Sequence, residues 1–357
     1  RMDNNRGDST LIVAASGLRN AHICPFGRTV ICKSTDNGRT WTSPTVVNDL
    51  PLDDRDAGIV SLGPNRLLLS WFTSDTRGYP IYTTYQDTKN QADVQRYANG
   101  FRRITDDTVA RWLGSWVRTS EDGGETWGSP VRVKVTAPHG PIQMPRGTLL
   151  YLGKLSSPSG AFDMRRKGGI IALKSDNDGQ TWHELGHVPL YPGTVGDHYH
   201  EPHVVALPDG KLLGLIRLQN KKPAPRLETL GLVHFSLMQT ISEDGGQSWS
   251  PAHPLGFHGS PPHLLCHSSG ALIAVYGYRQ PPFGQRAMLS YDGGTTWTYD
   301  YILRDDGPDG DLGYPSSVEL DDGSILTVYY QKRYTPDELC SLLWTRWRLV
   351  RNSGKDK

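Results

Sequence analysis

Short apolar segments separated by tight polar turns run through the whole sequence. The segment YHEPHVVALPDGKLLGLIR, residues 199–217, has an apolar run, a Pro-Asp-Gly turn and a second apolar run. This pattern predicts an antiparallel hairpin, with Glu201 near the start of the first strand and Arg217 at the end of the second. Similar hairpins recur along the chain: IVSLGPNRLLLSWF from Ile59, PIQMPRGTLLYLG from Pro141, HLLCHSSGALIAVYG from His263 and SSVELDDGSILTVYY from Ser316.

An octapeptide recurs five times downstream of these hairpins. Its copies are STDNGRTW from Ser34, SEDGGETW from Ser120, SDNDGQTW from Ser175, SEDGGQSW from Ser242 and SYDGGTTW from Ser290. The pattern is typical of a β-turn between two strands. Asp (Asn177 in the third copy) caps backbone N–H groups, Gly at the fifth position permits a positive φ, and Trp packs on the hairpin. We therefore interpret these residues as structural.

Each repeat unit is then a four-stranded antiparallel meander. Units begin near residues 1, 56, 138, 201, 261 and 314, the first being partial. Six such units predict an all-β chain folded as a single six-bladed β-propeller over residues 1–350, followed by a polar tail, 351–357. Residues 73–111 form a polar insertion, expected to be a loop or subdomain over one face.

The last unit lacks the octapeptide and has room for only three strands. Propellers commonly close when a strand from near the N-terminus completes the final blade, and that strand is not visible here. We expect the chain to start roughly 20 residues late relative to a complete propeller, or to close irregularly.

Composition and charge exclude some functions and leave others open. The 39 Gly, 25 Pro, 10 Trp and 16 Tyr suit many short strands and tight turns. A net charge of +1 without long basic blocks gives no support to a nucleic-acid or membrane partner. No membrane span or signal peptide is visible, so the compartment stays open, with a secreted or periplasmic one favoured. The oligomeric state also stays open, and no cofactor is expected.

The four cysteines match neither a redox motif nor a zinc motif. We expect free buried thiols, with a hairpin disulfide between Cys24 and Cys32 as the alternative.

With these repeats the sequence resembles sialidases (neuraminidases) and their bacterial Asp-box relatives, because the octapeptide matches the Asp box and the likeness covers nearly the whole chain. The boxes indicate the fold strongly and the activity weakly, since they also occur in lyases, other glycosidases and binding propellers. In sialidases three arginines hold the substrate carboxylate, and a tyrosine nucleophile is polarised by a glutamate. The resemblance implies Tyr314 as nucleophile, Glu201 as its base, and Arg217 and Arg286 as carboxylate ligands.

The residue types fit that chemistry. A sialic acid carries a carboxylate on its anomeric carbon, which would repel a carboxylate nucleophile but not a neutral phenol. A phenol with an ordinary pKa near 10 needs a base, and Glu201 would supply it. Arginine suits bidentate carboxylate binding.

The positions of the repeat provide a separate reason to expect that the candidate catalytic residues lie close together. Six residues before the turn residues Leu62, Leu207 and Leu320 stand Asp56, Glu201 and Tyr314. Equivalent positions of a propeller gather at one end of its central channel, where ligand sites form. We therefore predict that these three side chains meet.

Two parts of the sialidase pattern are missing. No Arg-Ile-Pro motif supplies the first arginine; the candidates are Arg1, Arg6, Arg19 and Arg55, of which we prefer Arg55 because it neighbours Asp56. Sialidases also use an aspartate near the first blade as the acid/base, and the first blade of this sequence has no counterpart of it. The candidates for that role are Asp54, Asp56 and His22.

Histidines begin three other blades, in HGP (His139), HEPH (His200, His203) and PPH (His263). Clustered histidines can bind a metal or transfer protons, but their spacing fits no compact metal motif and no metal is predicted. We assign His139, His203 and His263 to the substrate pocket, together with Arg279 of YGYRQPPFG. The loop LRDDGPDGDLG reads as a turn, with calcium binding as the alternative.

The sequence thus favours an exo-acting, retaining glycoside hydrolase that removes a terminal sialic acid or a related acidic sugar. A carbohydrate-binding propeller without turnover is one alternative. The other is a glycosidase or lyase acting on another uronic or deoxy sugar, for which the histidines would matter more.

Overall fold

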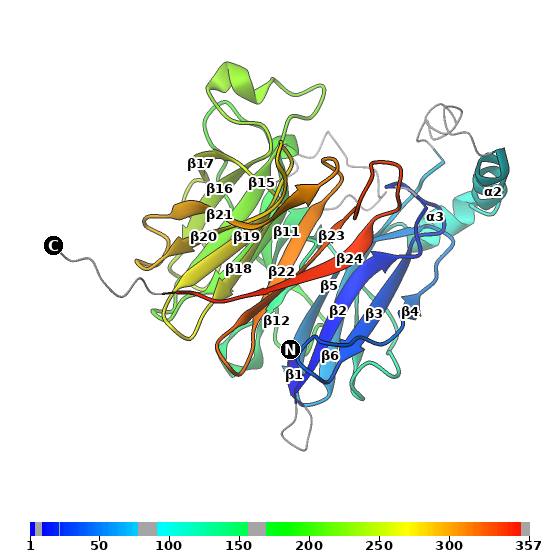
Figure 1. Ribbon diagram of the computed structural model, residues 1–357, viewed down its shortest axis with the longest axis horizontal. Helices are drawn as coiled ribbons and strands as arrows, with labels where there is room; N and C mark the ends of the chain where they lie inside the picture. The colour runs from blue at the N-terminus through cyan, green and yellow to red at the C-terminus, as the bar shows by residue number, and fades with distance from the viewer. Residues whose placement is uncertain (4–8, 21, 78–90, 156–168, 351–357) are drawn as a thin grey trace.

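Six small antiparallel sheets are arranged around a central axis in the computed structural model (Figure 1), which describes residues 1–3, 9–20, 22–77, 91–155 and 169–350. The chain is an all-β, six-bladed propeller, which confirms the fold predicted from the repeats. None of the helices in the described part of the chain is long and apolar enough to cross a membrane.

The first three sheets contain β1 to β13. The first is β1 (Met2–Asp3), β2 (Ser9–Gly17), β3 (Arg28–Ser34) and β4 (Thr45–Asn48). The second is β5 (Asp53–Gly63), β6 (Arg66–Ser74), β7 (Gly114–Ser120) and β8 (Val131–Val133). The third is β9 (Val135–Thr136), β10 (Ile142–Gln143), β11 (Leu149–Leu155), β12 (Ile170–Ser175) and β13 (His183–His187); here both β9 and β10 pair with β11.

The other three sheets contain β14 to β24. The fourth is β14 (Tyr199–Ala206), β15 (Leu212–Leu218), β16 (Ser236–Ser242) and β17 (His253–His258). The fifth is β18 (Pro262–Cys266), β19 (Leu272–Tyr278), β20 (Phe283–Ser290) and β21 (Thr298–Gly307). The sixth, with three strands among the described residues, is β22 (Gly313–Glu319), β23 (Ile325–Gln331) and β24 (Ser341–Trp347). Short 3-10 turns are η1 (Pro145–Gly147), η2 (Gly196–His198) and η3 (Leu227–Leu230).

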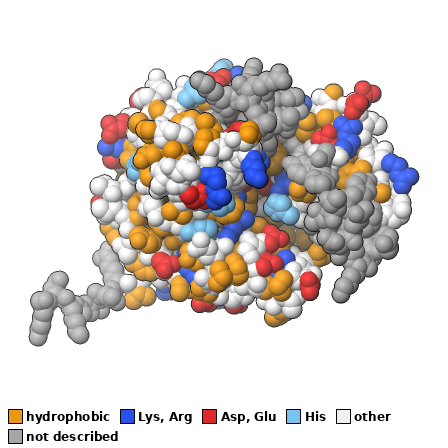
Figure 2. Space-filling view, turned by 90° about the horizontal axis from the view of Figure 1, so that it is seen from above, with side chains coloured by type: hydrophobic (Ala, Val, Ile, Leu, Met, Phe, Trp, Pro, Cys, Tyr) orange, Lys and Arg blue, Asp and Glu red, His pale blue; other side chains and the backbone are white. Residues whose placement is uncertain are grey.

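The up-and-down order of each sheet separates two faces of the molecule. We number the strands of each blade from the innermost outward, as first to fourth. The first strand of a blade begins on one face of the molecule, and the second strand ends on that same face. The octapeptide turns follow the third strands and lie on the opposite face. Figure 2 shows the first face, which is hollowed near its centre, with basic, acidic and histidine side chains around the hollow. The strand ends singled out in the sequence therefore share this face.

The octapeptides are β-turns whose first residue organises the backbone. The Ser120 hydroxyl accepts the N–H of Gly124 at 2.8 Å and donates to Asp122 at 2.8 Å, and Asp122 accepts the N–H of Thr126 at 2.9 Å. The other four copies repeat these bonds, and their fifth-position glycines all have a positive φ. The structural interpretation of the repeat is thus confirmed in atomic detail.

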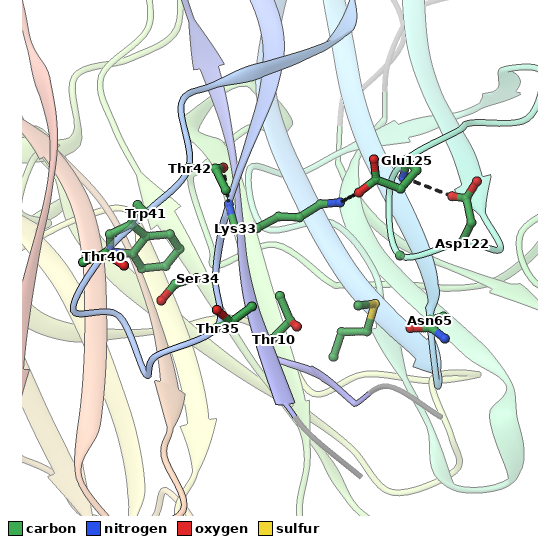
Figure 3. Close-up of a pocket in the computed structure, with 12 residues that line it drawn as sticks. Thr10, Lys33, Ser34, Thr35, Thr40, Trp41, Thr42, Asn65, Asp122 and Glu125 are labelled. Carbon is green, nitrogen blue, oxygen red and sulfur yellow. Dashed lines mark hydrogen bonds and ion pairs between the residues drawn. The ribbon is translucent and has the colours of Figure 1, made fainter. Parts of the chain in front are cut away.

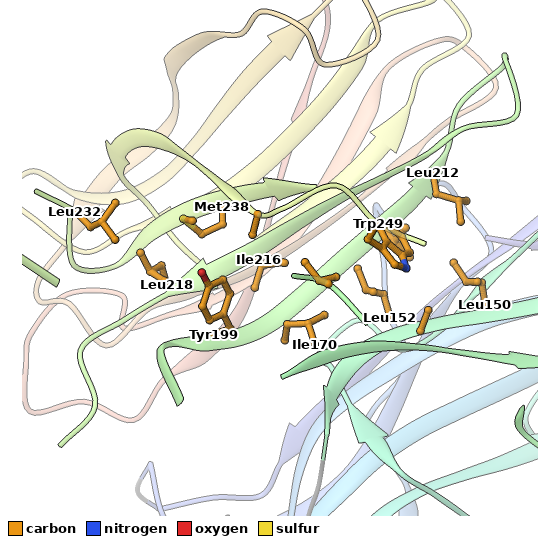
Figure 4. Packing of buried hydrophobic residues seen from close by; sticks show 14 of the residues in the cluster. Leu150, Leu152, Ile170, Tyr199, Leu212, Ile216, Leu218, Leu232, Met238 and Trp249 are labelled. Atoms are coloured by element: carbon orange, nitrogen blue, oxygen red, sulfur yellow. The ribbon is translucent and has the colours of Figure 1, made fainter. Parts of the chain in front are cut away.

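Apolar side chains fill the spaces between neighbouring blades. The cluster between the third and fourth blades (Figure 4) includes Leu150, Leu152, Ile170, Tyr199 and Ile216, all at most 2 % exposed. Burying one such side chain contributes about 1.5–3 kcal/mol. Packing of this kind holds the inner strands, and the residues at their ends, in fixed positions.

The insertion in the second blade contains two helices that the sequence did not predict, α2 (Gln91–Phe101) and α3 (Asp106–Trp112). Tyr97 of α2 packs against Cys24 and Phe26 of the β2–β3 loop. The insertion therefore supports that loop. Its residues 78–90, and the predicted tail 351–357, lie outside the described part of the chain.

All four cysteines are free, so the alternative of a Cys24–Cys32 disulfide is wrong. Cys24 and Cys32 are buried as expected, but Cys340 is exposed.

Candidate active site

Asp56, Glu201 and Tyr314 occupy equivalent places near the start of the inner strands β5, β14 and β22. Their φ angles are nearly identical, at 49°, 48° and 51°, and the pairing of each strand with its neighbour shifts register at the same point. A left-handed conformation is unfavourable for residues with a β-carbon and is concentrated at functional sites. A bulge of this kind re-aims a side chain.

Glu201 joins two partners from different strands. The Tyr314 hydroxyl donates to its Oε1 at 2.5 Å, and Nη1 of Arg217 donates to its Oε2 at 2.5 Å. Nη1 of Arg217 also lies 3.5 Å from the Tyr314 hydroxyl. The structure thus brings together a phenol, a carboxylate and a guanidinium, as the sequence predicted for these residues.

This arrangement sets the protonation of the pair. Burial alone would raise the pKa of Glu201, but the charge of Arg217 and the hydrogen bond from Tyr314 outweigh it and lower that pKa to about 2. Burial, together with the charges of Glu201 and Asp56, raises the pKa of Tyr314 well above 10. Near neutral pH the site therefore holds a neutral phenol that donates to an ionised carboxylate, the starting state for transfer of the phenolic proton.

Asp56 faces the same cluster. Burial raises the pKa of its carboxyl to about 6; Arg55 opposes this shift, and the charge of Glu201 adds to it. Asp56 therefore gains or loses its proton at a pH at which Glu201 stays ionised.

Two guanidinium groups stand over one aromatic ring. The Cζ atoms of Arg217 and Arg279 lie 4.7 Å and 5.7 Å from the ring centre of Phe235, and Cζ of Arg279 lies 5.9 Å from that of Tyr314. Nε and Nη2 of Arg279 are buried and have no hydrogen-bond partner among the described residues. Phe235 itself has a φ of 53°, an uncommon conformation for so bulky a residue.

Arg55 and His22 lie at the edge of the same cluster, where the first two blades meet. Nη2 of Arg55 is 3.2 Å from Nε2 of His22, and its Nη1 is 3.8 Å from Asp53. Burial and the charge of Arg55 lower the pKa of His22 to about 4. The charge of Arg55 also lowers the pKa of Asp56, which places its guanidinium near the cluster.

Comparison with known proteins identifies the repeats independently. The family model of the BNR repeat-like domain matches residues 101–327, which is more than half of the chain. The chain belongs to the BNR repeat-like family. A comparison with curated proteins found no match.

Solved structures share the fold of this BNR repeat-like protein at low sequence identity. A protein of unknown function from Dyadobacter fermentans has a TM-score of 0.71 at 21 % identity, covering 97 % of this chain and 92 % of the other. Trypanosoma rangeli sialidase, solved with the inhibitor DANA, has 0.59 at 15 %, covering 97 % and 54 %. The intramolecular trans-sialidase of Ruminococcus gnavus, solved with oseltamivir carboxylate, has 0.55 at 16 %, covering 98 % and 93 %.

The structure does not place Arg286 of the BNR repeat-like chain in the cluster. Its guanidinium, 2 % exposed, contacts Asp300 at 3.2 Å and the carbonyls of Pro282 and Arg304 at 3.2 and 2.8 Å. Arg286 stands on the third strand of its blade, so its side chain braces β20 and β21 instead. Arg279, which the sequence assigned to the pocket lining, is the arginine of the fifth blade that lies beside Phe235 and Tyr314.

The other arginine candidates are accounted for differently. Arg19 is bound by both carboxylate oxygens of Asp53, at 2.8 and 2.9 Å, and by the carbonyl of His22. Arg1 pairs with Asp3 and Asp321. Arg6 lies outside the described residues.

Asp54, one of the candidates for the acid/base role, contacts the loop before β5. It is fully buried, accepts the N–H of Leu50 at 3.3 Å, and burial raises the pKa of its carboxyl to about 8. Its contacts therefore hold the loop before β5.

The three predicted pocket histidines pack together: the rings of His203 and His263 are stacked, and the ring of His139 meets both edge-on. The ring centres of His203 and His263 are 4.3 Å apart, and that of His139 lies 5.2 and 5.0 Å from them. Nδ1 of His203 accepts the N–H of Leu264, and Nδ1 of His263 accepts the N–H of Ser317, so each ring ties its blade to the next. The three rings thus join three blades, and the hydrogen bonds of His203 and His263 to backbone N–H groups give these two a structural role.

Lys154 is a site residue that the sequence reasoning missed. It is the penultimate residue of β11, is 3 % exposed, and its Nζ lies 3.2 Å from Nδ1 of His200. Burial lowers the pKa of Lys154 to about 7, while the charge of Asp197 opposes the shift. Lys154 and Arg217 are each the sixth residue of their second strands, β11 and β15, and this equivalence was the one signal available in the sequence.

No group of three or more His, Cys, Asp or Glu side chains among the described residues is placed to hold a metal ion. In the loop first considered for calcium, Asp309 pairs with Lys332 at 2.7 Å and Asp311 accepts from Tyr330 at 3.1 Å. These contacts agree with the turn interpretation.

A separate cavity of about 460 Å³ lies at the octapeptide end (Figure 3). Lys33 pairs with Glu125 at its edge, and the octapeptide Trp41 forms part of its wall. It stands at the opposite end of the molecule from Glu201.

Proposed function

We propose that this protein is an exo-acting, retaining glycoside hydrolase that releases a terminal sialic acid or a related acidic sugar. The observation that carries this proposal is the hydrogen bond of 2.5 Å from the Tyr314 hydroxyl to Glu201, with Arg217 on the second carboxylate oxygen. The sialidase fold of the neighbouring structures agrees with it.

In the proposed first step, the Tyr314 oxygen attacks the anomeric carbon as the glycosidic bond breaks. Its proton passes to Glu201, whose ionised form is already the acceptor of that hydrogen bond. In the second step water attacks the same carbon, the tyrosinate leaves and recovers its proton from Glu201. Two inversions give net retention.

The acidic sugar is inferred from the charges around the phenol. Arg55, Arg217 and Arg279 approach the cluster from three blades, and two guanidinium nitrogens of Arg279 are buried without a partner among the described residues. A buried donor of this kind is costly unless a ligand accepts from it. A carboxylate on the anomeric carbon meets that need while the neutral nucleophile avoids repelling it.

The exo action is inferred from the closed channel. His139, His203 and His263 come from three blades and pack against one another, and we infer that they close the channel, so that a sugar enters from the hollowed face of Figure 2. A chain end fits such a pocket better than an internal residue of a polymer.

The test is a panel of fluorogenic α-sialosides and uronides, assayed with wild type, Tyr314→Phe and Glu201→Gln. We expect release from at least one α-sialoside, and a loss of about 10³-fold or more in kcat in both variants. The exposed Tyr334→Phe serves as a matched control with unchanged rate.

Each alternative has its own outcome in this panel. Binding of a sialoside without release by wild type would favour a carbohydrate-binding propeller. Release from a uronide with an unsaturated product would favour a lyase. Full activity of Tyr314→Phe would remove the tyrosyl mechanism.

A further inference from the structure

The proposed mechanism needs a proton donor on the side of the sugar away from Tyr314. Nucleophile and leaving group lie on opposite faces of the anomeric carbon, so an acid beside the nucleophile cannot reach the departing oxygen. Asp56 enters the channel at the same strand position and with the same φ as Tyr314 and Glu201. It therefore stands at the height of the nucleophile. The acid must come from the hollowed face above.

The loop between β2 and β3 places His22 at that face. The side chain of His22 is 58 % exposed, in contrast to the half-buried Tyr314. On one side of His22, Arg19 is clamped by Asp53 and holds the His22 carbonyl at 2.6 Å. On the other side, the N–H of Cys24 donates to Asp53 at 3.2 Å.

The β2–β3 loop is also held from outside. The hydroxyl of Tyr97, on α2, lies 3.4 Å from Sγ of Cys24, and its ring packs edge-on against Phe26. The backbone that carries His22 is thus fixed by contacts from the second blade and its insertion.

The His22 ring lies between a cation and an anion. Nη2 of Arg55 is 3.2 Å from its Nε2, and Oδ1 of Asp311, from the loop before β22, is 3.9 Å from its Nδ1. A guanidinium only donates, so Nε2 carries the lone pair and the proton of the neutral ring lies on Nδ1, toward Asp311. The Tyr330 hydroxyl donates to the same Asp311 oxygen at 3.1 Å.

We propose that His22 is the general acid/base of the hydrolase and that Asp311 is its positioning partner. This inference rests on the proposed function. The substrate carboxylate binds Arg55 and competes with His22 for its guanidinium, so Nε2 becomes free to take up a proton. The resulting imidazolium is stabilised by Asp311.

The protons balance over both steps. Nε2 of His22 gives its proton to the glycosidic oxygen as that bond breaks and the bond to Tyr314 forms, with the phenolic proton moving to Glu201. In the second step neutral His22 takes a proton from the attacking water, and Glu201 returns its own to the leaving tyrosinate. His22 ends protonated, as it began.

The charged groups around His22 fix the direction of the pH effect. Arg55, Arg19 and Arg279 lower the pKa of His22, and Asp311 raises it. Because the first step needs protonated His22, kcat/KM falls as pH rises through that pKa. Removal of the Asp311 charge lowers the pKa, so this decline moves to lower pH.

The experiment compares leaving groups. His22→Gln is assayed on an α-sialyl disaccharide, whose alcohol leaves only with a proton, and on a 4-nitrophenyl α-sialoside, whose phenolate leaves without one. We expect kcat/KM to fall by about 10²–10⁴-fold on the disaccharide and by less than about 10-fold on the aryl glycoside. Asp311→Asn should shift the decline of kcat/KM to lower pH. Asp305→Asn, an exposed residue of β21, is the matched control and should leave the profile unchanged.

Two results would overturn the assignment while leaving the tyrosyl mechanism intact. One is a wild-type rate on the disaccharide for folded His22→Gln. The other is an equal loss on both substrates, which means that His22 acts on something other than the leaving group. Absence of release by wild type on both substrates would instead overturn the proposed function itself, and this inference with it.

Discussion

Tyr314, Glu201 and Asp56 hold a left-handed backbone that costs about 1 kcal/mol or more for each residue with a β-carbon. Three equal strains at equivalent places of three blades are maintained by the surrounding sheets, and they turn three ionisable side chains into one channel. We take this shared conformation as the strongest sign, at the scale of single residues, that the cluster has a function.

The two arginines of the fifth blade differ in surroundings and therefore in expected effect. Arg279→Lys should raise KM for an acidic sugar by about 10-fold or more, because a planar donor pair is replaced by one ammonium. Arg286→Lys should lower the melting temperature with little change in KM, because its partners are backbone carbonyls and Asp300. Steady-state kinetics and thermal melts separate the two.

An increased KM in a well-folded Arg286→Lys protein, with Arg279→Lys unaffected, would restore the assignment made from the sequence. That assignment failed for a physical reason. Arg279 and Arg286 are only seven residues apart, on either side of the turn between β19 and β20, and the pairing of β20 with β21 shifts register three times. Spacing along the chain does not determine which of them turns inward.

The octapeptide turn is the element that the sequence describes best. Its Gly positions, its Asp cap and its place between third and fourth strands were all predictable, because each follows from local backbone chemistry. What the repeat does not reveal is the central part of the serine, whose hydroxyl bonds both to Gly and to Asp in the same turn. Ser begins all five copies, but its recurrence alone does not show which groups the hydroxyl bonds.

Removal of the cap should loosen one turn without affecting the site. Asp122 accepts from the N–H groups of Glu125 and Thr126 and from the Thr126 hydroxyl. We expect Asp122→Ala to lower the melting temperature by a few degrees while kcat/KM stays unchanged. Asp122→Asn, which copies Asn177 of the third turn, should keep most of the stability. A lowered kcat/KM in folded Asp122→Ala would contradict the separation of the two faces.

The two helices of the insertion and the divided inner strand of the third blade were not predicted from the sequence. The insertion is mostly polar, so α2 and α3 were not predicted, and their few apolar side chains, such as Tyr97 and Val109, pack against Cys24, Phe26 and Leu52. In the third blade the inner strand is divided into β9 and β10, with His139 in the gap. The sequence placed His139 in the pocket with the other histidines, but it did not predict this break in the inner strand.

At the scale of the whole molecule, six blades enclose a channel that three histidines close. Burial lowers the pKa of His139 to about 4 and that of His203 and His263 well below 6.5. Unfolded histidines take up protons as pH falls below 6.5, whereas the buried rings do not. Their contribution to stability is therefore present above pH 6.5 and is lost as pH falls toward 4.

Asp54 and Asp56 act in the opposite direction, because their raised pKa values favour the folded state as pH falls. The histidines' contribution to the pH dependence of stability is therefore measured by comparing wild type with a variant that lacks one of these histidines. His203→Asn keeps an acceptor for the Leu264 N–H but does not titrate. We expect the melting temperature of wild type to fall more between pH 7 and pH 5 than that of this variant. Equal losses would show that the stack is not the acid-sensitive part of the molecule.

The propeller architecture could be predicted from the repeat alone, because a regular repeat of short strands and turns has few ways to bury its apolar faces. The cluster of Tyr314, Glu201 and Arg217 also followed, since equivalent positions converge in a propeller. Contacts between distant loops did not follow: Arg55 with His22, and His22 with Asp311, join residues from three blades.

The most direct test of the account is the identity of the residue that becomes glycosylated. A 2,3-difluoro analogue of the released sugar forms the covalent intermediate and slows its hydrolysis, because fluorine next to the anomeric carbon destabilises the cationic transition state of both steps. Intact mass measurement followed by peptide mapping should find one sugar per chain, attached to Tyr314, and none in Tyr314→Phe. A sugar on another residue, or full turnover of the parent sialoside with no adduct at Tyr314, would contradict the tyrosyl mechanism.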